Sequence, residues 1–147
     1  MSNPVLNIRI NENINAAGSL LEATLDKNVT GPTPLIVQGL MVLGAAQEGL
    51  IQERRKVERA LERKDIRNPS TDLLRKAGAD FQARYDFLVS IENVIDTIRE
   101  DVQWAVYRLS MQDDLAIEHL FKVKKHFRTI RDIIFDAADQ SWAGKRL

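Results

Sequence analysis

The sequence has no cysteine and only two histidines, His119 and His126, among its 147 residues. The lack of cysteine excludes disulfides, thiol nucleophiles and cysteine-bound metals, and it is compatible with the cytoplasm. The two histidines show neither the Glu-x-x-His nor the His-x-x-x-His spacing of helical metal sites. A Gly-rich phosphate loop and a nucleophile elbow are also missing from the sequence. We therefore expect no enzyme activity, no metal site and no cofactor.

Glycine and proline are scarce in the second half of the chain. Between Gly78 and Gly144 neither residue occurs, which favours long helices over a multi-stranded sheet. Hydrophobic residues make up 44% and charged residues 29%, a composition typical of globular proteins rather than disordered ones. We expect a mostly α-helical protein.

Long hydrophobic runs and an excess of one charge are also lacking. The most apolar stretch, residues 35–46, is shorter than the roughly 20 residues that a membrane helix needs. The N-terminus lacks the basic and apolar regions of a secretory signal. The formal net charge is zero, so any attraction to DNA has to come from local groups. These features predict a cytoplasmic protein without a membrane span.

Residues 6–10 alternate between apolar and polar side chains. Leu6, Ile8 and Ile10 are separated by Asn7 and Arg9. This period of two predicts a short strand with one apolar face.

Helical patterns follow this predicted strand. Apolar residues recur at helical spacing over residues 13–27, and the chain then breaks at 28–32. A second helix is expected over residues 34–64, with Thr33 as its N-cap and Pro34 at its first position. Its first half is apolar and its second half is heavily charged.

The C-terminal half carries a heptad-like pattern that predicts a helix of about forty residues. Its positions are Leu74, Ala77, Phe81, Arg84, Leu88, Ile91, Ile95, Ile98, Val102, Ala105 and Leu109. The pattern changes phase near residues 110–114 and continues from Leu120. This change indicates a helical hairpin, or a continuous helix with a stutter. Six aromatic residues of this half are expected in the core: Phe81, Phe87, Trp104, Tyr107, Phe121 and Phe127. The alternative for Trp104 and Tyr107, which extend beyond the heptad positions, is that they mark an interface.

The predicted strand, short helix, loop and second helix resemble the ribbon–helix–helix family of DNA-binding proteins. The resemblance covers residues 5–49, with Ile14, Leu21 and Leu25 at the core positions of the first helix. It implies that two chains pair their strands into a ribbon that enters the major groove. The implied fold is an N-terminal ribbon–helix–helix module of one short strand and two helices, followed by a long-helix C-terminal bundle.

The same resemblance implies a set of contacts to double-stranded DNA. Val5, Asn7 and Arg9 would face the base edges, where Arg suits guanine and Asn suits adenine. Thr33 and the backbone N–H of Leu35 would hold a phosphate at the start of the second helix. Against these contacts, residues 1–50 contain four acidic and only two basic side chains.

The chain divides on this interpretation into three parts. Residues 1–50 form the dimerisation and DNA-binding module, residues 51–69 a charged connector, and residues 70–147 a bundle for oligomerisation or partner binding. This layout resembles TraM-type accessory proteins of conjugative plasmids, and a transcriptional regulator fits it equally. We expect a sequence-specific DNA-binding protein that is a dimer, or a tetramer, with a possible protein partner at residues 70–140. The alternative is a helical adaptor, secretion-type chaperone or structural protein that binds other proteins and no DNA.

A run of basic residues near the C-terminus allows two interpretations. It comprises Lys122, Lys124, Lys125, His126, Arg128 and Arg131 without an intervening acid. It predicts a solvated helix face or, alternatively, a contact to nucleic acid or anionic lipid.

Overall fold

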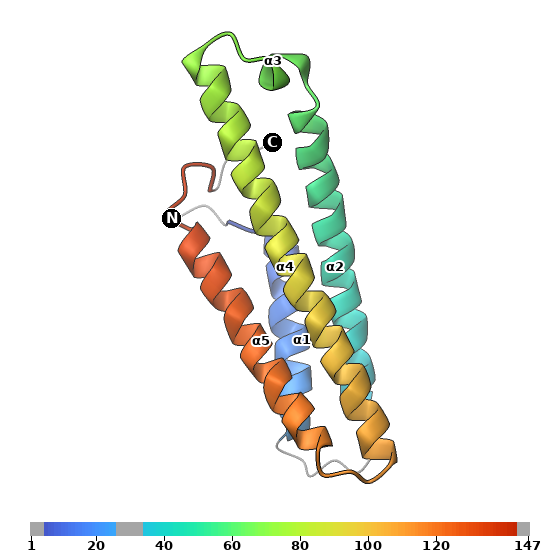
Figure 1. The fold of residues 1–147 in the computed structure, drawn as a ribbon. Coiled ribbons are helices and arrows are strands. Elements are labelled where there is room, and N and C mark those ends of the chain that lie inside the picture. Colours follow the sequence, from blue (N-terminus) through green and yellow to red (C-terminus); the bar gives the residue numbers. More distant parts are fainter. Residues whose placement is uncertain (1–4, 26–33, 144–147) are drawn as a thin grey trace.

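The computed structural model describes residues 5–25 and 34–143, and all regular elements in these ranges are helices. They are α1 (Ile8–Leu25), α2 (Pro34–Leu61), α3 (Lys64–Arg67), α4 (Asp72–Ser110) and α5 (Ala116–Ala137). The four long helices form an antiparallel bundle in which α1 packs on α2, α2 on α4, α4 on α5 and α5 on α1 (Figure 1). The single-turn α3 lies in the connection between α2 and α4. The predicted C-terminal helical bundle is therefore present, as part of a bundle that also includes α1 and α2.

The predicted strand at residues 6–10 is wrong, because these residues lead into α1 and form its first turn. Asn7 caps this helix: its Oδ1 accepts a hydrogen bond of 2.9 Å from the Arg9 N–H, and its backbone carbonyl accepts one from Asn11. Leu6 and Ile10 are buried, but Ile8 is 62% exposed. The apolar residues at 6 and 10 thus share one face because they lie about one helical turn apart, not because they alternate along a strand.

The ribbon–helix–helix resemblance falls with the strand, since that fold requires one. The layout resemblance to TraM-type proteins depended on the same N-terminal module and falls with it. In the described residues α1 instead packs along α2 within one chain. α2 continues without a break past residue 50, where the sequence suggested that one part ends and the next begins.

The two helices of the C-terminal half form a hairpin, and their ends explain why. Thr71 caps α4 by accepting a hydrogen bond from the Leu74 N–H. At the other end the Asp113 N–H donates to the Arg108 carbonyl and the Gln112 N–H to the Leu109 carbonyl. This pair of bonds is a Schellman motif, which ends a helix with one residue in the left-handed region. Gln112 occupies that position with φ 55°, where glycine is usual.

A continuous core runs through the four long helices. Its largest fully buried side chains include Ile14 and Leu21 of α1, Leu43 and Leu50 of α2, Ile95 of α4, and Ile130 of α5. The heptad pattern of α4 predicted this side of the helix, because Leu88, Ile91, Ile95, Ile98, Val102, Ala105 and Leu109 are all buried.

Helices α1 and α2 approach closely at two glycines of α2. A Cβ atom placed on Gly39 would lie 2.7 Å from Leu21 Cγ, and one placed on Gly49 would lie 2.7 Å from Ile10 Cγ1. A Cβ atom on Gly44 would meet nothing within 4 Å. The three glycines of α2 therefore have different roles: Gly39 and Gly49 permit close contact with α1, and Gly44 faces open space.

The segment after α5 returns to α4. Trp142 is buried, with its ring centroid 5.2 Å from that of Phe87. Arg84, the one polar residue in the heptad pattern, donates a hydrogen bond of 2.7 Å to the Trp142 carbonyl. Burial lowers the pKa of the Arg84 guanidinium, while Glu53 and Asp80 act in the opposite direction. The polar interruption in the pattern is thus the place where the C-terminal segment docks.

Among the described helices, only α2 has a length and composition that would let it cross a membrane. Core helices of soluble proteins have the same properties, so membrane insertion has only weak support.

Candidate functional site

Large apolar side chains are exposed around the turn between α4 and α5. We call the following six residues the apolar surface: Trp104, Tyr107, Met111, Leu115, Ile117 and Phe121. Their exposed fractions lie between 44% for Leu115 and 64% for Met111. Residues 104, 107 and 111 share the outer face of α4, and residues 117 and 121 share one face of α5, because they are three or four positions apart. Groups of exposed apolar side chains of this kind mark contact sites in soluble proteins.

A carboxylate shared by two histidines lies beside this surface. Asp101 of α4 has His119 Nδ1 3.3 Å from its Oδ1 and His126 Nε2 2.9 Å from its Oδ2. The three side chains are mostly buried, with exposed fractions of 14%, 16% and 25% for Asp101, His119 and His126. Two oxygens of one carboxylate therefore connect two turns of α5 to one position of α4.

The histidine pair also supports the aromatic residues. The Trp104 ring stacks on His119 with centroids 6.4 Å apart and planes 18° apart. Tyr107 meets the Trp104 ring edge-on at 6.0 Å. Trp104 is thus held between two rings, one of which is fixed in turn by Asp101. These contacts order the half-exposed Trp104 side chain.

In the described part of the chain, no set of three acidic, histidine or cysteine side chains is placed to hold a metal ion.

The exposed charged side chains differ in sign between a segment of α4 and a segment of α5. Between residues 80 and 110, the exposed charged side chains of α4 are all acidic: Asp86, Asp96 and Glu100. Between residues 121 and 131, those of α5 are all basic: Lys122, Lys124, Lys125, Arg128 and Arg131. The lysines and arginines of the basic run noted in the sequence are therefore exposed, whereas His126 is mostly buried against Asp101.

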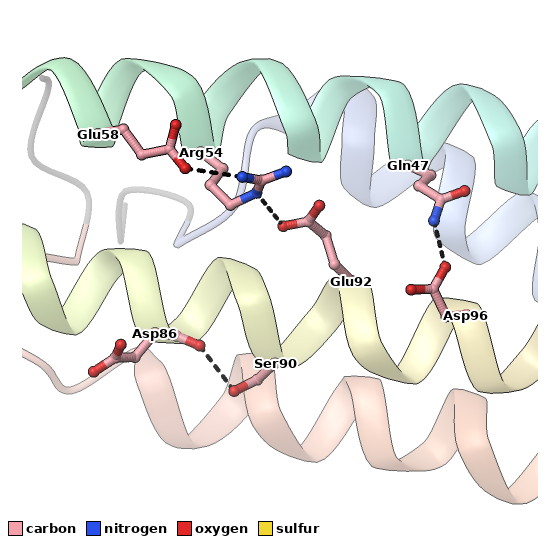
Figure 2. A network of polar contacts seen from close by, with 7 residues as sticks. All are labelled: Gln47, Arg54, Glu58, Asp86, Ser90, Glu92 and Asp96. Atoms are coloured by element: carbon pink, nitrogen blue, oxygen red, sulfur yellow. Dashed lines mark hydrogen bonds and ion pairs between the residues drawn. The ribbon is translucent and has the colours of Figure 1, made fainter.

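A polar network joins α2 to α4 on another side of the bundle (Figure 2). Arg54 donates hydrogen bonds of 2.8 Å to Glu92 and to Glu58, and the Glu92 bond is the main cause that raises the pKa of the Arg54 guanidinium. One helical turn or more away, Gln47 donates to Asp96 at 2.7 Å and accepts from Arg99 at 2.5 Å. These bonds pair residues of two antiparallel helices in one register, so the network has a structural role.

An open cavity of about 240 Å³ lies between α1 and α5. Gly18 and the Phe127 ring form part of its lining, and Glu22 and Arg131 pair at 3.8 Å beside it. The volume is below the range of roughly 300–1,000 Å³ that is usual for small-molecule sites. We assign it no ligand.

The residues predicted to bind DNA do not lie on a ribbon. Val5 is half-buried against the core, and Asn7 and Arg9 are exposed around the start of α1. Leu35 is half-buried in the first turn of α2, and Thr33 lies outside the described residues. The contacts predicted for them to DNA lose the geometry on which they depended, and DNA binding itself stays a prediction.

The expectation that most aromatic residues lie in the core holds for Phe87 and Phe127, which are buried. It does not hold for Phe121, which is 58% exposed. It does not hold either for Trp104 and Tyr107, which are 48% and 57% exposed, and an interface at these two residues stays a prediction. Asp101 was missed, because its contacts come from another helix and no local pattern reveals them.

No protein-family model matches the chain, and comparison with curated proteins and with solved structures gives no significant match.

Proposed function

We propose that this chain is a non-catalytic, cytoplasmic helical-bundle protein that works by docking another protein on its apolar surface. The observation that carries the proposal is the exposure of Trp104, Tyr107, Met111 and Phe121 around one turn of the bundle. The surface lies within residues 70–140, the part from which the sequence predicted a protein partner.

Physical chemistry supports a protein partner. Aromatic residues and Met are enriched at protein interfaces, where Trp and Tyr often dominate the binding energy. Burial of apolar area is favourable by about 25 cal/mol per Å², and the six large side chains around the turn expose such area. Trp104 is already ordered by His119 and Tyr107. Docking would therefore cost less side-chain entropy than it does for a free tryptophan.

Site-specific photo-crosslinking tests the proposal in the organism that makes the protein. A benzophenone amino acid replaces Met111 in one variant and Phe121 in another, and both positions are exposed enough to accept it. The control carries the same group at Leu73, which is 78% exposed at the opposite end of α4. We expect a protein adduct of defined mass from positions 111 and 121 and none from position 73. Absence of an adduct at both test positions, or equal adducts at all three, contradicts the proposal.

A second candidate function, DNA binding, keeps one supporting observation. Lys122, Lys125 and Arg128 are exposed on α5 and could neutralise phosphates. A gel-shift titration of wild type and of Lys122→Glu/Lys125→Glu at two salt concentrations tests it. Binding that weakens with salt and is lost in the variant supports this candidate, and equal binding by both proteins, or none by either, removes it.

A further inference from the structure

We propose that the partner of the apolar surface is a second copy of this chain, bound through a two-fold axis that runs parallel to the bundle. This inference rests on the proposed function, because it assigns an occupant to the same surface. In the dimer α4 of each copy faces α5 of the other.

The level of each residue along the bundle follows from the contacts between α4 and α5. Asp101 reaches both His119 and His126, so it lies level with the middle of the segment between them. Trp104 lies level with His119, on which it stacks. Since each helical residue rises 1.5 Å and the helices are antiparallel, Glu100 is level with Lys122 and Lys125.

The charges at this level are complementary between the two helices. Glu100 on α4 is exposed, as are Lys122 and Lys125 on α5. None of the three forms an ion pair with another described residue. A rotation about an axis parallel to the helices keeps every residue at its level and exchanges α4 with α5. Glu100 of each copy would then face Lys122 and Lys125 of the other, twice in one dimer.

The apolar residues match in the same arrangement. Trp104 would lie at the level of His119 in the second copy, about 3 Å along the axis from Phe121 and one turn along from the charged pairs. Tyr107 and Met111 would continue the contact toward Ile117 at the turn. Apolar contact at the end of the bundle and opposite charges beside it are the two features that a specific surface needs.

The alternative face-to-face dimer has its axis perpendicular to the helices and is unfavourable. It would place α4 against α4 and α5 against α5. Acidic residues would then face acidic ones, and basic residues would face basic ones, which is destabilising. The charge distribution therefore selects the parallel axis.

The test uses two charge reversals on the full chain, measured by light scattering at several concentrations. Glu100→Lys leaves only positive charges at positions 100, 122 and 125, and Lys122→Glu/Lys125→Glu leaves only negative charges at these positions. We expect the wild type to be a dimer and each variant to dimerise roughly tenfold or more weakly, because two attractive contacts become repulsive. An equimolar mixture of the two variants restores both contacts, so it should dimerise like the wild type.

Matched controls reverse exposed charges elsewhere. Glu48→Lys on α2 and the pair of Arg55→Glu on α2 with Lys76→Glu near the start of α4 change the net charge as the test variants do, at positions outside the proposed contact. These should dimerise like the wild type. A monomeric wild type, variants that dimerise normally, controls that weaken dimerisation equally, or a mixture that stays monomeric each overturns the inference.

Crosslinking separates this inference from the proposed function. Adducts at positions 111 and 121 with twice the mass of the chain support both. Adducts that contain only a different protein contradict the proposal that the partner is a second copy, but they support the proposed function. A complete lack of adducts overturns both.

Discussion

Replacing glycine with alanine should have different effects on the free energy of unfolding at two positions of α2, Gly39 and Gly44. Gly39 faces α1, where a new Cβ atom would lie 2.7 Å from Leu21 Cγ, and Gly44 faces open space. Replacing either glycine with alanine favours the helix by about 1 kcal/mol, because alanine loses less backbone entropy. At Gly39 the new methyl group must also displace Leu21, which is 1% exposed and closely packed. Overpacking of this kind costs about 1–3 kcal/mol.

The difference between the two variants isolates the packing cost, since the helix-forming gain is common to both. We expect Gly44→Ala to raise the free energy of unfolding by about 0.5–1 kcal/mol. Gly39→Ala should then be less stable than Gly44→Ala by about 1–3 kcal/mol. Urea unfolding followed by circular dichroism measures both, at one protein concentration because dimerisation would shift the midpoint. Equal stability of the two variants would show that α1 and α2 do not approach as described.

Four further outcomes follow from particular contacts. Trp142→Ala should lower the free energy of unfolding by about 3 kcal/mol, because a buried indole against Phe87 is lost. In Trp104→Phe, which leaves Trp142 as the one tryptophan, the fluorescence of Trp142 should resist quenching by acrylamide because this side chain is buried. Gln112→Gly should raise the free energy of unfolding by about 0.5–1 kcal/mol in a urea titration, because φ 55° suits glycine. Asp101→Asn should lower it by about 1–3 kcal/mol by removing the charged partner of two histidines, whereas Glu48→Gln, at an exposed position of α2, should change it by less than about 0.5 kcal/mol. The hydrogen bond from the Leu115 N–H, aided by Arg108, lowers the pKa of Asp113. The contribution of Asp113 to stability is therefore present above the ordinary carboxyl pKa of about 4 and is lost as the pH falls through the lower folded value. Asp113→Asn should be less stable than wild type at pH 7, and this difference should shrink as the pH falls below about 4.

The long helices could be predicted because their signal is long and regular. The heptad pattern extends over most of α4, and its positions from Leu88 to Leu109 are buried as the spacing requires. The break predicted near residues 110–114 is also confirmed, because α4 ends at Ser110. Periodicity over many turns averages out single exceptions such as Arg84, so the pattern remains readable.

The predicted strand at residues 6–10 was wrong because five residues are too few to distinguish the period of a strand from that of a helix. Leu6 and Ile10 share a face both in a strand and about one turn apart in a helix. The deciding residues are Ile8, which is exposed, and Asn7, whose side chain caps α1. Asn as an N-cap is a sequence signal of helix starts, and it competes here with the alternation. The apparent strand was the only support for the ribbon.

No glycine in the sequence marks the C-terminal end of α4. Gln112 fills the left-handed position of the Schellman motif, so the usual C-cap signal is missing, and the phase change alone indicated the turn. The candidate site was visible in part, since Trp104 and Tyr107 fall outside the heptad positions. The contact of Asp101 with His119 and His126 depends on how α4 and α5 align, which no pattern within one helix specifies.

That alignment connects the interior contacts to the proposed dimer. Asp113 and the Schellman motif fix where α4 ends and α5 begins. Asp101 then fixes the level of α5 by holding two of its turns at once. A shift of one helical turn, 5.4 Å, would separate Glu100 from the level of Lys122 and would remove Trp104 from His119. The complementarity of the outer faces therefore depends on polar contacts inside the hairpin, which gives the Asp101 carboxylate a positioning role for the surface that it does not itself reach.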